Sequence, residues 1–136
     1  MTTDSGKFYA KGASFLLVCI LVILGGLALR RYGYSIGLTF PVVKYGGSVL
    51  WGAMVYLLTA TVMLGRKTYD LVVIFACCTA IAVELLRLAH FPALDAFRDT
   101  SIGTLLLGRV FSPWNIACYF AGIAIAAVTT RPLVKR

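Results

Sequence analysis

The feature that most constrains this chain is a series of four apolar stretches, each long enough to cross a lipid bilayer as a helix. They run from about 13 to 29, 45 to 64, 71 to 89 and 113 to 130. A spanning helix needs about 20 mostly apolar residues, because a rise of 1.5 Å per residue must cover a hydrocarbon layer about 30 Å thick. The connections are short, so the sequence predicts an all-α membrane protein in which residues 1–136 form one compact bundle of four transmembrane helices.

The composition agrees with a lipid-embedded chain. Hydrophobic residues make up 60% of the sequence and charged residues only 13%, which lies outside the usual range of soluble domains. The formal net charge is +8, but the basic residues flank the apolar stretches, where they orient helices and meet anionic headgroups. The sequence has no aromatic and basic motif for RNA, so we expect no nucleic-acid partner. We expect a multi-pass protein of the inner (plasma) membrane.

The charges at the ends of the stretches predict the topology. An even number of spans puts both termini on one side, where seven basic residues face six on the other. This small excess favours termini in the cytoplasm. The segment from about 93 to 111 does not read as a span, because charges interrupt apolar residues at helical spacing. These apolar residues are Leu94, Phe97, Ile102 and Leu105. The spacing predicts a short helix at the membrane surface or a shallow re-entrant segment.

Glu84 is the most informative residue, because it lies about 20 Å along the third stretch and inside the hydrocarbon layer. An unpaired charge there costs on the order of 2.5 to 3.5 kcal/mol, so Glu84 needs a partner. Arg87 follows three residues later on the same helix face. Asp95 and Arg98 repeat this spacing after Pro92, so we expect two acids and two bases to meet in one cluster. The cluster either clamps the surface helix onto the bundle or forms a ligand site, and the sequence leaves both open.

Further polar residues are expected near this cluster. Lys44 and Arg109 add positive charge on the same side of the membrane. His90 lies at the water boundary beside these charges. Because arginine and lysine side chains suit phosphate, the sequence predicts a binding site for an anionic lipid or envelope-precursor headgroup near the outer leaflet. Membrane lipids are therefore the expected partners.

Nothing in the sequence indicates a cofactor or a metal ion. His90 is a single histidine among scattered carboxylates, which lacks the spacing of a metal site. The four cysteines lie in apolar stretches without a C-x-x-C pair. No nucleophile elbow, P-loop or H-E-x-x-H pattern is present, so the known catalytic motifs do not support an enzyme.

Two other functions remain open from the sequence. Small residues at helical intervals, such as Gly47, Gly52 and Gly122, let helices approach closely, within the bundle or against a larger membrane complex in which the chain is an accessory subunit. An enzyme acting on a lipid-linked substrate would use Glu84 or Asp95 as general base, but no nucleophile or metal completes a mechanism. We therefore rank headgroup binding first and the enzyme last.

One set of residues resembles a known family. It comprises Glu84-Leu85, Leu88, His90, Pro92, Leu94-Asp95-Ala96 and Arg98, preceded by Lys44-Tyr45 and Trp51 and followed by Asn115, Tyr119 and Gly122. Over this range the chain resembles the small bacterial membrane proteins of the domain-of-unknown-function family numbered 2809, which look akin to the VanZ-like proteins. The VanZ-like pattern has E-x-x-Q near a helix end, and this chain has Arg87 in place of the glutamine. The resemblance implies a helical membrane fold and leaves the activity open.

Overall fold

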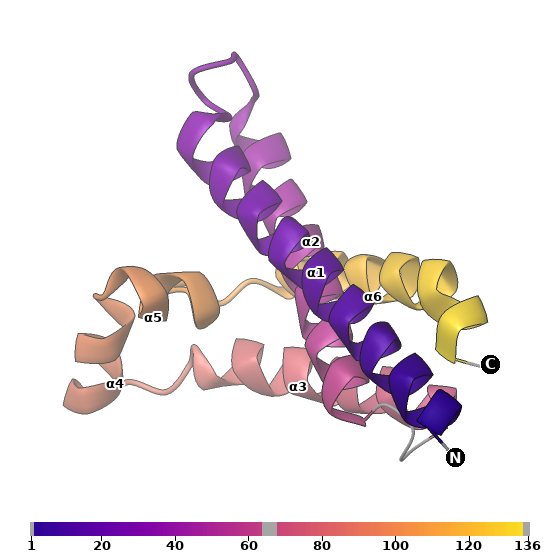
Figure 1. Cartoon of the computed structure of the whole chain (residues 1–136). Helices are drawn as coiled ribbons and strands as arrows, with labels where there is room; N and C mark the ends of the chain where they lie inside the picture. Colours follow the sequence, from indigo (N-terminus) through magenta and orange to yellow (C-terminus); the bar gives the residue numbers. More distant parts are fainter. Residues whose placement is uncertain (1, 64–67, 135–136) are drawn as a thin grey trace.

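The computed structural model describes residues 2–63 and 68–134, and this part of the chain contains six helices. The long helices are α1 (Thr2–Tyr32), α2 (Phe40–Met63), α3 (Tyr69–Leu86) and α6 (Pro113–Val134), and each contains a candidate membrane span. Two short helices, α4 (Pro92–Arg98) and α5 (Ser101–Leu106), lie between α3 and α6 (Figure 1). The predicted fold class is confirmed, and these four helices indicate a multi-pass membrane protein. Residues 64–67, at the connection between the second and third predicted spans, and the basic residues at 135 and 136 lie outside the described residues.

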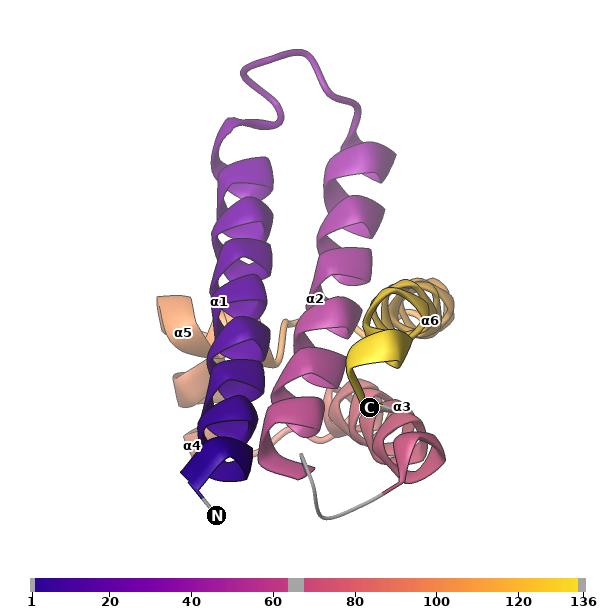
Figure 2. The same cartoon turned by 45° about the vertical axis from the view of Figure 1, so that its right-hand side comes forward.

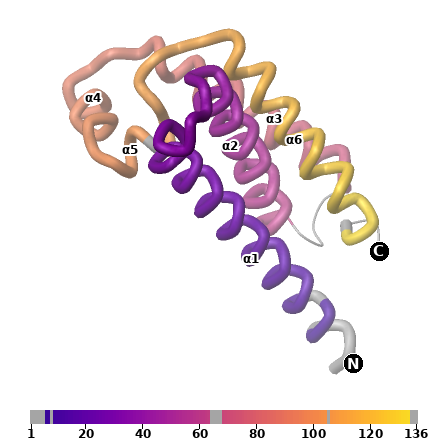
Figure 3. Tube along the Cα trace, turned by 90° about the horizontal axis from the view of Figure 1, so that it is seen from above, coloured from indigo at the N-terminus to yellow at the C-terminus, as the bar shows by residue number. Residues whose placement is uncertain are grey.

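Helix α2 is the centre of the bundle. It packs against α1, α3 and α6, whereas the contacts of α1 are mainly with α2. Helices α3 and α6 lie side by side and are steeply inclined to the α1–α2 pair (Figures 1 and 2). Seen from above, the N-terminal part of α1 and the end of α6 lie towards one side and α4 and α5 towards the other (Figure 3), whereas the α1–α2 connection projects well away from α4 and α5 in Figures 1 and 2.

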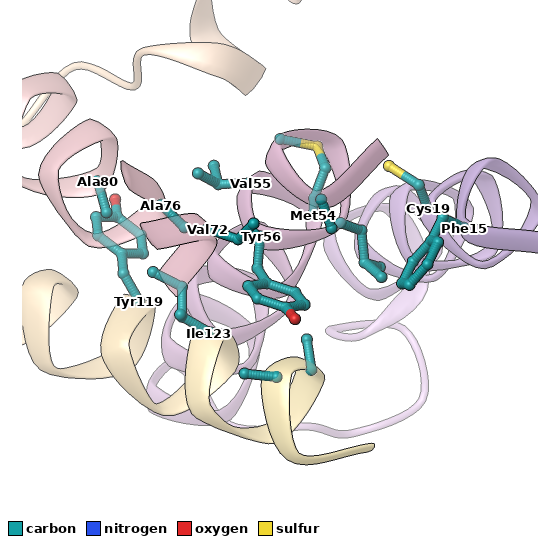
Figure 4. Packing of buried hydrophobic residues seen from close by; sticks show 14 residues of the cluster. Phe15, Cys19, Met54, Val55, Tyr56, Val72, Ala76, Ala80, Tyr119 and Ile123 are labelled. Atoms are coloured by element: carbon teal, nitrogen blue, oxygen red, sulfur yellow. The ribbon is translucent and has the colours of Figure 1, made fainter. Parts of the chain in front are cut away.

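The core contains a close crossing of α2 and α6. Tyr56, Tyr119 and other side chains fill the space between the helices, as Figure 4 shows. A Cβ atom added at Gly52 would overlap the backbone of Tyr119, and one added at Gly122 would overlap the carbonyl oxygen of Val49. The two backbones therefore touch at this point. Gly52 and Gly122 have the packing role that small residues play between membrane helices.

Several helix ends differ from the predicted span bounds, and two of them, the start of α2 and the end of α3, have a local cause. Helix α2 begins at Phe40 and not near residue 45, because Pro41 lies in its first turn, where a missing N–H removes no helical hydrogen bond. Helix α3 ends at Leu86 and not at residue 89. Arg98 of α4 donates hydrogen bonds to the carbonyl oxygens of Leu86 and Ala89, and these bonds stabilise an end to the helix there.

The segment predicted as one surface helix forms two helices. Helix α4 ends at Arg98 and α5 begins at Ser101. The hydroxyl of Thr100 accepts a hydrogen bond of 3.0 Å from the N–H of Gly103, so Thr100 caps the start of α5. The apolar periodicity continues across this break, which explains why the sequence predicts a single helix. The side chain of Leu105 lies outside the described residues.

Candidate functional site

Glu84 is the centre of a buried polar network between α3 and α6. Its side chain is completely buried. One carboxylate oxygen lies 2.7 Å from Nη1 of Arg87 and accepts a hydrogen bond of 3.0 Å from the hydroxyl of Tyr119. The other oxygen accepts hydrogen bonds from the backbone N–H of Ser112 at 2.7 Å and from the amide of Asn115 at 3.3 Å. The predicted pair of Glu84 with Arg87 is confirmed, and α6 supplies the remaining donors that a buried carboxylate requires.

Arg87 connects this network to the chain segment that precedes α6. Its Nε donates to the carbonyl oxygen of Leu107, and its Nη1 donates to that of Val110 at 3.3 Å. Its Nη2 has no hydrogen-bond partner among the described residues and lies beside Gly108. A Cβ atom at Gly108 would come within 2.7 Å of Nη2, and the φ of +65° there also favours glycine. The guanidinium is thus fixed on one side and keeps one nitrogen free for another acceptor.

A cavity of about 230 Å³ adjoins Arg87. Four cationic side chains line it, from the end of α1, the first turns of α2, the end of α3 and the segment before α6. They are Arg30, Lys44, Arg87 and Arg109. No acidic residue of the described chain lines the cavity. The volume is several times the roughly 30 Å³ that one water molecule occupies in the liquid, so the cavity has room for a small anionic group.

Two of the four cations have no carboxylate partner in the part of the chain that the structure describes. These are Arg30 and Lys44, and the ammonium of Lys44 lies 5.7 and 5.4 Å from the centroids of two aromatic rings on its own helix. Arg109 pairs with Asp99 at 2.9 Å, but both side chains are more than half exposed. Such a surface pair contributes about 0–1 kcal/mol, so it competes weakly with an incoming anion. The cavity therefore has a positive charge that the protein itself does not balance.

Trp51 adds a buried donor to the wall of this cavity. Its Nε1 is inaccessible and has no hydrogen-bond partner among the described residues. The ring is held against Tyr119, with 4.6 Å between the two ring centroids. A buried N–H without an acceptor costs about 1–3 kcal/mol, so an oxygen atom of water or of a ligand is expected to satisfy it.

The prediction that two acids and two bases form one cluster is wrong, because the structure separates them into two pairs. Asp95 and Arg98 pair at 3.0 Å on α4, and His90 lies 3.4 Å from Asp95. No described hydrogen bond or ion pair joins them to Glu84 and Arg87. The physical reason is that the guanidinium of Arg98 donates to the carbonyl oxygens of Leu86 and Ala89 at and just after the end of α3, whereas the donors of α6 and of Ser112 surround Glu84.

The predicted site residues lie either at Arg87 and its cavity or at the separate pair of Asp95 and Arg98, which His90 adjoins. The cavity is lined by Lys44, Trp51, Arg87, Arg109, Asn115 and Tyr119. Sequence reasoning does not identify Arg30, although its place on the same side of the membrane as Lys44 was an available signal. It does not identify Ser112 as the main-chain donor to Glu84, because no pattern of side chains specifies such a bond.

The comparison with known families agrees with the resemblance drawn from the sequence. No solved structure matches this chain. The model of the family described as "Protein of unknown function (DUF2809)" matches residues 39–123, a range that contains the Glu84 network and every cationic residue of the cavity except Arg30. Because this match covers more than half of the 136 residues, the chain belongs to the DUF2809 family.

Proposed function

We propose that this protein binds the phosphate-bearing headgroup of an anionic lipid or envelope precursor in the cavity beside Arg87. The observation that carries the proposal is the cavity lining, in which four cationic side chains meet without an acidic residue of the described chain. Arginine forks and lysine ammonium groups bind phosphate oxygens through charge-assisted hydrogen bonds. Trp51, whose buried Nε1 has no hydrogen-bond partner among the described residues, lines the same cavity.

The surroundings of Glu84 favour binding over catalysis. A general base needs a free lone pair within reach of the substrate. Glu84 is completely buried and already receives the guanidinium of Arg87 and the donors of Ser112, Asn115 and Tyr119. Its role in this proposal is to hold Arg87 in position at the cavity wall.

Native mass spectrometry of the detergent-solubilised protein tests the proposal. We expect the wild type to retain phosphatidylglycerol in preference to phosphatidylcholine. The variant Arg30→Gln should reduce this preference about tenfold or more, because a hydrogen bond to a charged group contributes about 1.5–3 kcal/mol. The matched control is Arg31→Gln, which removes the same charge from an exposed neighbour that does not line the cavity.

The control should change the preference less than Arg30→Gln does, because Arg31 contributes only to the general attraction of the surface for anionic lipid. Equal retention of the two lipids by the wild type would contradict the proposal. Equal effects of Arg30→Gln and Arg31→Gln would show that the surface charge, and not the cavity, selects the lipid.

We further propose that both termini lie in the cytoplasm, which puts the cavity at the outer leaflet. The excess of basic residues on the side of the termini supports this orientation. Alkaline phosphatase fused after Arg136 should be inactive, and a green fluorescent protein fused there should fluoresce. The opposite pair of results would reverse the orientation, and termini on different sides would contradict the four-span topology.

Kinship with the VanZ-like proteins also remains a proposal. It is supported by the residues that carry the resemblance, because Asn115 donates to Glu84 and Gly122 packs against α2. Arg87, which stands where that pattern has glutamine, supplies the charge that balances Glu84. A solved structure of a VanZ-like protein without an equivalent contact between these helices would contradict the kinship.

A further inference from the structure

We infer that the ligand of the cavity is a lipid phosphate whose hydrocarbon chain lies in the groove between α1 and α2. This inference rests on the proposed binding of an anionic headgroup and adds the place of the chain. Three observations support it. A narrow groove lies between α1 and α2, this groove shares lining residues with the cavity, and the groove runs along the two helices away from Arg30.

A narrow groove between α1 and α2 meets the cavity. Its α1 side is formed by residues between 22 and 30, and its α2 side by residues between 47 and 54. Arg30 and Trp51 line both the groove and the cavity. Every other residue that lines the groove is apolar or a glycine. The cationic cavity and the apolar groove thus adjoin at Arg30 and Trp51, which places charged and apolar contacts side by side, as a headgroup with an attached hydrocarbon chain requires.

Helix α2 presents the two kinds of surface in adjacent rows. Gly47, Leu50 and Met54 follow one another at helical spacing and line the groove. The neighbouring row includes Lys44 and Trp51, which line the cavity. One ligand can therefore contact both rows at once, with its charged and apolar parts on different faces of the same helix.

The glycines of the groove leave space that the packing of the helices does not need. A Cβ atom at Gly26 would have Leu50 as its nearest neighbour at 3.9 Å, and one at Gly47 would lie 3.5 Å from the Nε of Arg30. Both distances are ordinary van der Waals contacts. At Gly52, by contrast, a Cβ atom would overlap the backbone of α6. A methyl group could thus stand at either position without a shift of the helices. The groove encloses only about 30 Å³, so a hydrocarbon chain would lie along it and keep one side exposed to the membrane.

The position of Arg30 gives the direction of the ligand. Arg30 lies in the last turn of α1, and Val22 lies eight residues earlier, about 12 Å deeper along the span. A phosphate bound between Arg30 and Trp51 directs its chain along the groove towards Val22. This puts the charge near the membrane surface and the chain in the hydrocarbon layer, as in the lipids of the bilayer. A free phosphate would occupy the cavity and leave the groove unused.

Photo-crosslinking of the full-length protein in nanodiscs tests the path of the chain. The probe is phosphatidic acid with a diazirine in the middle of one acyl chain, and peptide mass spectrometry locates the labelled residues. We expect label at Val22, Ile23, Gly26 and Met54, reduced by unlabelled phosphatidic acid but not by phosphatidylcholine. Ile74, on the exposed face of α3, reports general contact with lipid. Equal labelling of Ile74 and the groove, with the same response to both competitors, would overturn the inference.

A matched pair of variants tests the groove itself. Gly26→Leu fills the groove, whereas Gly25→Leu adds the same side chain at an exposed position with no atom within 4 Å of the new Cβ. We expect Gly26→Leu to weaken the binding of phosphatidic acid about tenfold and to leave the binding of glycerol 3-phosphate unchanged. Gly25→Leu should change neither.

The results of these experiments distinguish a failure of the groove inference from a failure of the proposed headgroup binding. If both variants bind phosphatidic acid with equal affinity, the acyl chain does not lie in the groove and the inference is overturned. Headgroup binding in the cavity still stands in that case, provided that glycerol 3-phosphate competes. A wild type that binds neither phosphatidic acid nor glycerol 3-phosphate overturns the proposed function itself. If Gly26→Leu does not fold, the labelling of the wild type decides the question.

Discussion

Replacing Glu84 with glutamine should lower the free energy of unfolding by about 3 kcal/mol, because it leaves the buried guanidinium of Arg87 without its anionic partner. The glutamine side chain also has only one acceptor oxygen, whereas the donors around Glu84 bind to two carboxylate oxygens. The double variant Glu84→Gln with Arg87→Gln should recover part of the loss, because it removes the unpaired charge. Thermal melting of the detergent-solubilised proteins measures both effects.

The control for this experiment is Asp99→Asn. Asp99 pairs with Arg109 where both side chains are mostly exposed, so its loss should cost less than about 1 kcal/mol. Single and double variants of the buried pair that melt with the wild type would contradict a stabilising role. If they remain stable but lose their preference for anionic lipid, the pair serves the ligand and not the fold.

Gly122→Leu should have the second large effect, near the upper end of the approximately 1–3 kcal/mol that overpacking costs. An added Cβ atom would overlap the carbonyl oxygen of Val49, so α2 and α6 must separate to make room. A backbone atom cannot rotate away as the end of a flexible side chain does. The shift would also disturb Asn115 and Tyr119, which reach Glu84 from the same helix.

The melting temperature of Gly122→Leu checks this prediction, with Gly25→Leu as the matched control. Gly25 lies in a helix and has open space around it, so leucine there should be neutral or stabilise the protein by up to about 1 kcal/mol. A Gly122→Leu variant that melts with the wild type would show that α2 and α6 do not depend on their backbone contact.

The long helices and the central ion pair could be predicted from the sequence because each follows from a local rule. Length and hydropathy indicate the spans, and the cost of a charge at depth requires a partner for Glu84, which the i, i+3 spacing identifies as Arg87. Asn115 and Tyr119 were identified as site residues only from the family resemblance. Their bonds to Glu84 depend on how α3 and α6 face each other, and a hydrophobic pattern along one helix does not specify this rotation.

The cavity and the partners of Arg98 could not be predicted for the same reason. The repeated acid and base spacing suggested that Asp95 and Arg98 would join Glu84. Spacing describes one helix face, but the carbonyl oxygens of Leu86 and Ala89 can accept from Arg98 only because the helix has ended at Leu86. The cavity likewise arises where cationic residues distant in the sequence meet in space.

The attachment of the segment from 92 to 111 relies on two arginines that donate to main-chain oxygens. Arg87 and Arg98 reach the carbonyl oxygens of Leu86, Ala89, Leu107 and Val110. Every amino acid supplies such an oxygen, so mutational drift at these four positions does not remove an acceptor. The two arginines have no such latitude, because lysine lacks the planar fork of several donors that each of them uses. We therefore expect few substitutions to be tolerated at Arg87 and Arg98, and more at the residues whose carbonyl oxygens they bind.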